Sequence, residues 1–204
     1  MENPLLSLLQ KKNLAAQLYG LPGTYKTTVL LQIIHKRLQE GHNSIYLIDT
    51  SNNFPIVRLK PIKHLLQKLI VFQPKTVEEE AFLLDDLSCQ LLSQKSLLLI
   101  DDVFRHTNLE DKANLHLNSY ILAQIKAISR KVDFPVILTN QARSYDNNIH
   151  PFLQSLTLHY LDWHFLFEKT QDTNQIRITF FDQDQYISQW DHKISKTGFL
   201  SDIK

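Results

Sequence analysis

Cysteine and glycine are both scarce in this chain, and each scarcity narrows what the protein can be. Cys89 is the only cysteine among 204 residues, so no disulfide forms within the chain and a reducing compartment suits it. We expect Cys89 to be a small buried side chain in a helix, because no histidine stands near it in sequence to act as a base. Only four glycines occur. Gly20 and Gly23 share one short loop, which predicts a special task for the backbone there.

An excess of charge and a long apolar run are also missing. Lys and Arg number 22 against 21 for Asp and Glu, so the net charge argues neither for nor against a nucleic-acid partner. No run of about 18 apolar residues is present to cross a bilayer, and the first residues lack the features of a signal peptide. We therefore expect a cytoplasmic protein without a membrane partner. Its 43% of apolar residues can form the core of a single domain over residues 1–204.

Apolar patterning predicts an α/β fold. Up to residue 139 strands alternate with helices, as in a parallel sheet covered on both faces. After residue 155 three consecutive strands are expected, joined by polar hairpin turns at 172–174 and 182–184. The fold class is thus a mostly parallel central sheet flanked by helices, with an antiparallel C-terminal strand extension. The expected strands are 14–19, 44–49, 69–72, 96–101, 134–139, 156–167, 175–181 and 185–190, and the expected helices are 26–38, 60–68, 76–93 and 115–131.

One loop nearly matches a phosphate-binding pattern. That pattern requires glycine, four residues, glycine, lysine and then serine or threonine. Gly20, Lys26 and Thr27 fit it, but Tyr25 stands at the second glycine, where bare backbone normally approaches the phosphates. The nucleotide-binding residues expected from this loop are Gly20, Leu21, Pro22, Gly23, Thr24, Tyr25, Lys26, Thr27 and Thr28.

The loop also predicts where a metal ion lies. Lys26 would reach the β- and γ-phosphates, and the Thr27 hydroxyl would help to hold Mg²⁺. A carboxylate is needed at the end of a neighbouring strand, and Asp101 supplies it. For the adjacent Asp102 we expect a solvated strand end that caps a helix. The expected cofactors are ATP and Mg²⁺.

Several segments, in order, resemble the RecA/RadA recombinase superfamily, and most of all its short RadB-like paralogues, which consist of the core ATPase domain. The similar segments are Leu18–Gly23, Leu47–Thr50, Leu69–Phe72, Ile137–Gln141 and Trp163–Lys169. The resemblance spans about residues 5 to 200. It implies a RecA-like P-loop fold and a role in homologous recombination and DNA repair, beside a full-length RecA/RadA-type recombinase or another paralogue.

The resemblance also assigns roles to single positions. Gln141 corresponds to the glutamine that senses the γ-phosphate. Ser51 stands where the family has the glutamate that activates water, and Asn52 replaces a glycine. A serine is a poor general base, and loss of a base typically costs about 10²–10⁴-fold in rate. We therefore expect hydrolysis to be slow or absent, which leaves open whether the chain is an enzyme. Asp49 is expected to be structural.

Residues that could bind single-stranded DNA are few. The loop expected after Gln141 contains Arg143, and Arg105 follows the strand that ends at Asp101. Each could contact a phosphate, although both segments also read as ordinary surface loops.

Three functions remain open. The first is an ATP-binding accessory factor in recombination, and the second is a non-hydrolysing scaffold with a vestigial nucleotide site. The third is a P-loop kinase for a small metabolite, which is disfavoured because the arginines form no cluster in the sequence.

Overall fold

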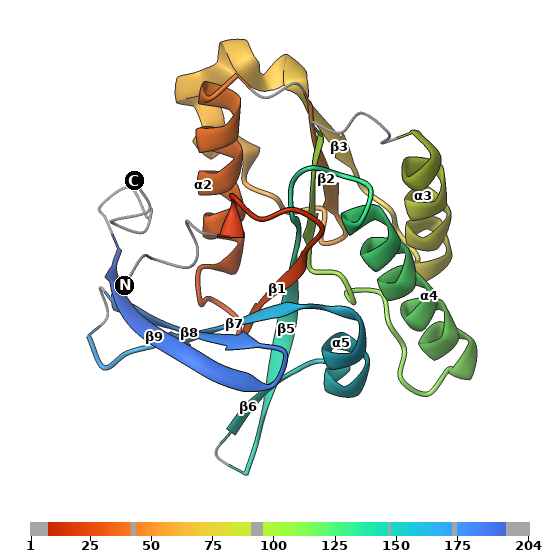
Figure 1. The fold of residues 1–204 in the computed structure, drawn as a ribbon, viewed down its shortest axis with the longest axis vertical. Helices are drawn as coiled ribbons and strands as arrows, with labels where there is room; N and C mark the ends of the chain where they lie inside the picture. The colour runs from red at the N-terminus through yellow and green to blue at the C-terminus, as the bar shows by residue number, and fades with distance from the viewer. Residues whose placement is uncertain (1–7, 42–43, 91–95, 147, 173–174, 195–204) are drawn as a thin grey trace.

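The computed structural model describes residues 8–41, 44–90, 96–146, 148–172 and 175–194. Nine strands form one sheet in the order β3-β2-β4-β5-β1-β7-β8-β9, and β6 pairs with β5 (Figure 1). Six neighbouring strands, from β3 to β7, run parallel, whereas β8 and β9 are antiparallel. The strands are β1 (Ala15–Gly20), β2 (Ser44–Asp49), β3 (Leu69–Phe72), β4 (Ser96–Asp101), β5 (Val136–Tyr145), β6 (Asn148–Pro151), β7 (Trp163–Lys169), β8 (Gln175–Asp182) and β9 (Gln185–Lys193).

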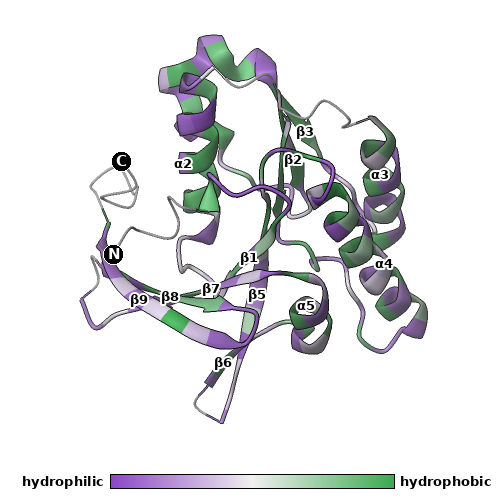
Figure 2. Ribbon diagram, in the orientation of Figure 1, coloured by the Kyte–Doolittle hydropathy of each residue, from purple (hydrophilic) through white to green (hydrophobic). Residues whose placement is uncertain are grey.

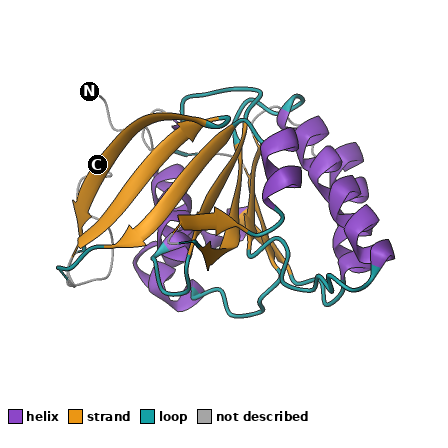
Figure 3. Cartoon of the chain, turned by 90° about the horizontal axis from the view of Figure 1, so that it is seen from below, coloured by secondary structure: helices purple, strands orange, loops and turns teal. Residues whose placement is uncertain are grey.

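Helices cover both faces of the parallel strands (Figure 3). One buried cluster joins the sheet to α2 and the 3₁₀ segment η1, and a second joins the opposite face to α3, α4 and α5. Figure 2 shows hydrophobic and hydrophilic residues alternating around α2, α3 and α4, as expected for helices with one buried face. The helical segments are α2 (Lys26–Gln39), η1 (Ile56–Lys68), α3 (Val77–Gln90), α4 (Lys112–Ser129) and α5 (Gln154–Tyr160). The predicted α/β class is confirmed.

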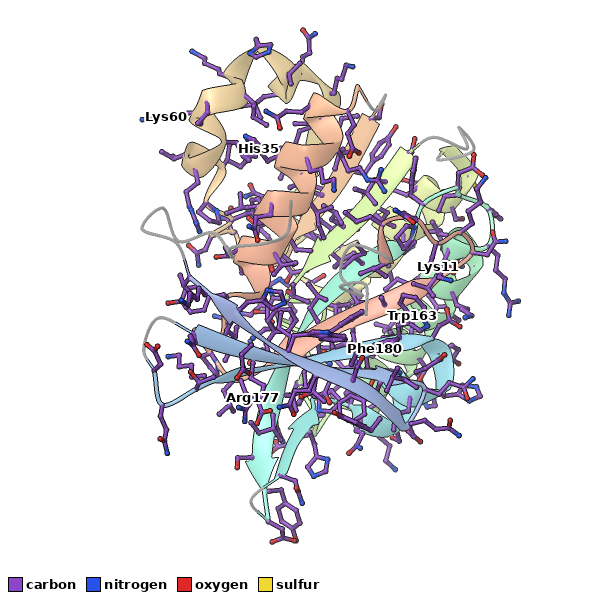
Figure 4. All side chains as sticks on the ribbon, turned by 60° about the vertical axis from the view of Figure 1, so that its left-hand side comes forward. Lys11, His35, Lys60, Trp163, Arg177 and Phe180 are labelled. Atoms are coloured by element: carbon purple, nitrogen blue, oxygen red, sulfur yellow. The ribbon has the colours of Figure 1, made fainter. Side chains whose placement is uncertain are left out.

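The C-terminal strands carry an aromatic cluster. The ring centroids of Trp163 and Phe180 lie 5.0 Å apart, and those of Phe165 and Phe180 lie 4.9 Å apart. Lys11 lies over the indole of Trp163 (Figure 4). The cluster joins the antiparallel extension to the main core.

Two sequence predictions in the C-terminal half are wrong. Residues 156–167 are not one strand, because α5 occupies Gln154–Tyr160 and β7 begins only at Trp163. Leu156 and Tyr160, four residues apart, pack on the same cluster, which is helical spacing. Strand β5 also runs on to Tyr145 and pairs with β6, so the segment after Gln141 is a β-hairpin and not a loop.

One smaller expectation is wrong, because Cys89 is exposed rather than buried. Helix α3 begins at a capping pair: Thr76 Oγ1 accepts a hydrogen bond from the Glu79 amide at 3.1 Å, and the Glu79 carboxylate accepts one from the Lys75 amide at 2.7 Å. In the described part of the chain, no helix has the length and apolar character needed to span a membrane.

Candidate nucleotide-binding site

The loop that connects β1 to α2 is fixed to β7 at Gly20. Gly20 is paired with Phe167 in the sheet. A Cβ atom on Gly20 would lie 2.3 Å from the carbonyl oxygen of Phe167 and 2.8 Å from Thr24 Oγ1. No side chain fits at that distance, so the first glycine of the motif is required by packing against the neighbouring strand.

Replacement of this glycine should therefore destabilise the fold. We expect Gly20→Ala to lower the free energy of unfolding by about 3 kcal/mol, because overpacking against backbone cannot relax easily. Gly41→Ala is the control: a Cβ there meets nothing within 4 Å, although φ is +83°, so only about 1 kcal/mol should be lost. Urea unfolding would measure both. Equal losses would contradict the packing argument.

Tyr25 keeps the backbone geometry that glycine usually provides. Its φ and ψ are 65° and 14°, in the left-handed region, at the N-terminus of α2. This conformation costs a residue with a side chain roughly 1–2 kcal/mol. The tyrosine ring packs against the buried cluster beneath α2, and it does not line the cavity described below. The loop thus forms its turn without the second glycine.

Lys26 lies within the curve of the loop. Its Nζ donates hydrogen bonds to the carbonyl oxygens of Gly20 at 2.8 Å and Leu21 at 3.1 Å, and it lies 3.3 Å from Thr24 Oγ1. Burial lowers the pKa of Lys26 to about 8, although the carboxylates of Asp102 and Asp101 act in the opposite direction. A half-buried ammonium whose hydrogen bonds go only to neutral oxygens suits an anion such as a phosphate.

Asp101 lies at the end of β4, opposite the start of α2. Its carboxylate accepts hydrogen bonds from Thr27 Oγ1 at 3.0 Å and from Thr139 Oγ1 at 2.7 Å. Burial raises the pKa of Asp101 to about 6, more than these two hydrogen bonds lower it. A carboxylate and a hydroxyl side by side form the oxygen-rich site that Mg²⁺ prefers, so Thr27 and Asp101 fit the predicted metal.

These groups meet in a cavity of about 190 Å³ at the C-terminal edge of the sheet. Ser51 and Gln141, predicted from separate segments, both lie in its wall. Ser51 Oγ donates to Asp49 Oδ1 at 2.8 Å, while Gln141 Nε2 donates to Asp102 Oδ2 at 3.0 Å. The complete lining is Pro22, Lys26, Thr27, Ser51, Asp101, Asp102, Thr139 and Gln141.

Asp49 ends β2, and Asp102 follows the end of the neighbouring strand β4. Asp49 has the role that the sequence predicted, whereas Asp102 does not. Asp49 is buried and accepts hydrogen bonds from Ser51, the Phe54 amide and Gln73, in keeping with the predicted structural role. Asp102 is not a helix cap, because Asp111 caps α4. The Asp102 carboxylate instead lines the cavity, since its backbone turns at a φ of 67°.

Sequence analysis missed Thr139, which lines the cavity, and Arg58, which lies beside the loop. Thr139 orients Asp101 and also accepts a hydrogen bond from the Asp102 amide at 2.7 Å. Arg58 Nη1 donates to Thr28 Oγ1 at 3.1 Å, which brings a second cation to the first turn of α2. A hydroxyl at the end of the expected strand 134–139 was a detectable signal, whereas the position of Arg58 depends on the path of η1.

A second cavity, of about 180 Å³, adjoins the first and contains both predicted DNA-binding residues. Arg105 is exposed in the turns after β4, and Arg143 is exposed on β5 with its guanidinium 4.7 Å from the ring centre of Phe152. Asp102 and Gln141 belong to the walls of both cavities. The lining is Asp102, Phe104, Arg105, Thr107, Asn140, Gln141, Ala142, Arg143 and Phe152.

The raised pKa of Asp101 predicts that the stability of the protein depends on pH, in one direction without metal and in the opposite direction for stabilisation by Mg·ATP. Without metal, the native state favours the protonated acid, so stability falls on the order of 2 kcal/mol as the pH rises from about 4 to about 6. Bound Mg²⁺ favours the ionised form, so stabilisation by Mg·ATP should grow over the same interval.

Replacement of Asp101 tests the pH dependence of the free protein and that of the stabilisation by Mg·ATP. We expect Asp101→Asn to remove this loss in the free protein and to remove the stabilisation by Mg²⁺. Thermal unfolding at pH 5 and pH 8, with and without Mg·ATP, measures the four cases. Asp86→Asn, at an exposed position of α3, should behave as the unmodified protein. An unchanged pH profile in Asp101→Asn would contradict the assignment.

Comparison with known proteins agrees with this geometry. Residues 3–129 match the NB-ARC domain model. The DNA repair and recombination protein RadB of Methanococcus maripaludis is 31% identical over 163 residues, which cover 74% of each chain. The RadB of Methanocaldococcus jannaschii is 27% identical over 149 residues, 67% of this chain and 69% of that one.

The fold gives the same answer. The crystal structure of the RadB recombinase superimposes with a TM-score of 0.76 at 20% identity, and the match covers 95% of this chain and 92% of that structure. The predicted resemblance and the RecA-like fold are confirmed. Through residues 3–129 the chain belongs to the NB-ARC group of domains and, over three quarters of its length, to the RadB family of DNA repair and recombination proteins.

Proposed function

We propose that this protein binds Mg·ATP at the P-loop cavity and acts as an accessory factor in homologous recombination and DNA repair. Thr27 and Asp101 would hold Mg²⁺, and Lys26 would contact the phosphates. Bound Mg²⁺ supplies charge neutralisation between phosphate oxygens. Ser51 cannot replace a carboxylate base, so hydrolysis should be slow. The expected setting is the cytoplasm.

One observation supports this proposal: the cavity that contains Lys26 and the cavity that contains Arg105 and Arg143 share a wall. Gln141 begins the part of β5 that leads to Arg143, and its side chain is hydrogen-bonded to Asp102, three residues before Arg105. A γ-phosphate that engages Gln141 would break or reshape this hydrogen bond. Both arginines would then respond to the nucleotide, which is a means of coupling ATP to single-stranded DNA.

The test is the anisotropy of a fluorescent single-stranded oligonucleotide, titrated with protein in the presence and absence of Mg·ATP. We expect tighter binding with Mg·ATP. The Arg105→Ala, Arg143→Ala double variant should bind at least about tenfold more weakly and with a smaller salt dependence, because two phosphate contacts are lost. Arg130→Ala, at the exposed end of α4, is the matched control. Equal binding by all three proteins would reject the DNA-binding surface.

The partner is proposed to be a full-length RecA/RadA-type recombinase or another paralogue. Co-sedimentation of purified protein with recombinase filaments on single-stranded DNA tests this interaction directly. Absence of the protein from the pellet, with and without Mg·ATP, would count against it.

The scaffold function is the second candidate. The observation in its favour is that the Lys26 ammonium already donates hydrogen bonds to carbonyl oxygens of the loop, which also contains Tyr25. Calorimetric titration with Mg·ATP separates the two candidates. Binding at micromolar to sub-millimolar concentrations supports the ATP-dependent factor, whereas no heat at millimolar nucleotide supports the scaffold.

A further inference from the structure

A second lysine lies against the phosphate-binding loop, on the side away from the metal cavity. Strand β7 runs parallel to β1, with Phe167 opposite Gly20, so Lys169 continues beside the loop where β1 has ended. Its Nζ lies 3.2 Å, and its Cε 3.7 Å, from the position that a Cβ on Gly23 would take. The side chain therefore covers Gly23, which has a φ of 76°.

The charge of Lys169 is available to a ligand. The residue is exposed, and among the described residues its Nζ takes part in no hydrogen bond or ion pair. Its neighbour Glu168 points to the opposite face of β7, as alternation in a strand requires, and lines a different cavity together with Tyr19. Arg177 lies across the strand pair from Glu168. Within the described part of the chain, Lys169 thus adds an uncompensated positive charge beside the loop.

The order of the strands decides which part of a nucleotide lies near this charge. Asp101 ends β4 and Gln141 lies on β5, and both strands are on one side of β1, whereas β7 is on the other. In the proposed binding mode the metal and the γ-phosphate would lie on the Asp101 side. A polyphosphate along the loop would then have its nucleoside end toward β7.

We propose that Lys169 binds the nucleoside-proximal α-phosphate of the nucleotide. This inference rests on the proposed nucleotide binding and extends it. Gly23 leaves space for the lysine beside the loop amides, so the ammonium and the amides would contact the same phosphate from two directions. Because ATP and ADP share this phosphate, Lys169 should stabilise both equally, in contrast to Gln141, which is proposed to contact the γ-phosphate.

Calorimetric titration with Mg·ATP and with Mg·ADP tests the inference. We expect Lys169→Ala to raise both dissociation constants by the same factor, roughly tenfold, as for the loss of one charge-assisted hydrogen bond. Lys169→Arg keeps the charge and should stay within about threefold of the unmodified protein. Lys63→Ala, at an exposed position of η1, should change neither constant. Equal melting temperatures without nucleotide would show that the variants are folded.

The possible failures can be told apart. If the unmodified protein binds neither nucleotide, the proposed function fails and the inference with it. If the unmodified protein binds both nucleotides and Lys169→Ala leaves both dissociation constants unchanged, only the inference is overturned. A loss confined to ATP would also overturn it, because Lys169 would then contact the γ-phosphate.

Discussion

Lys26→Ala should abolish stabilisation of the protein by nucleotide. A ligand present at 100 times its dissociation constant stabilises the native state by about 2.7 kcal/mol, which corresponds to a rise of roughly 5–10 °C in melting temperature for a domain of this size. Lys26 is the cation inside the loop, with its Nζ held between the carbonyl oxygens of Gly20 and Leu21. Its removal leaves the phosphates without their closest positive charge.

Thermal unfolding with and without Mg·ATP measures the effect. Lys36→Ala, ten residues further along α2, is the matched control and should show the full shift. Comparison of the free proteins shows whether loss of the loop hydrogen bonds alone lowers the melting temperature. If Mg·ATP raises the melting temperature of Lys26→Ala as much as that of the control, the nucleotide does not bind at the loop.

Ser51→Glu should raise ATP hydrolysis, and the size of the gain measures how much of the catalytic site is intact. Ser51 lines the cavity together with Lys26, Asp101 and Gln141, so a carboxylate at this position faces the place of the γ-phosphate. A positioned base contributes about 10²–10⁴-fold. The nearby carboxylates of Asp49 and Asp101 would raise the pKa of the new glutamate and make it a stronger base.

We expect a gain of roughly 10²-fold over the unmodified protein, the lower end of that range, since Asp49 would lose its hydrogen bond from the Ser51 hydroxyl. Steady-state phosphate release measures the rate. Ser51→Gln has nearly the same shape as Ser51→Glu but cannot accept the proton, so it should remain at background. Equal rates in the two variants would locate the defect at Tyr25 or in a group that a partner supplies.

The sequence was most informative where residue identity is imposed by local chemistry. Asp101 could be assigned because it ends an apolar strand, and the ends of parallel strands meet at one edge of a sheet. The role of Gln141 was implied by the resemblance to the RecA/RadA superfamily. The strands and helices up to residue 139 were predictable from the spacing of their apolar residues. Sequence analysis did not predict that β5 extends to Tyr145. Polar residues such as Arg143 and Ser144 resemble a loop until their pairing partner in β6 is known.

The remaining features depend on contacts between distant segments. Arg58 reaches Thr28 through the course of η1, a 3₁₀ segment with Pro61 inside it and a kink at Ile62. The position of Lys169 over Gly23 follows from the pairing of β7 with β1. Local patterns carry no information on such pairings, so these two cations could be recognised only in the folded chain.

Tyr25 has a consequence for the thermodynamics of ligand binding. A glycine at this position would leave the empty loop free to sample many backbone conformations, and a ligand would have to select one of them. The tyrosine reduces that freedom, because its partly buried side chain packs against the core while its backbone stays in the left-handed region. Binding should therefore carry a smaller entropic penalty from loop ordering than in a glycine loop. The cost of preorganisation appears instead in the native state, as backbone strain that is present before any nucleotide arrives.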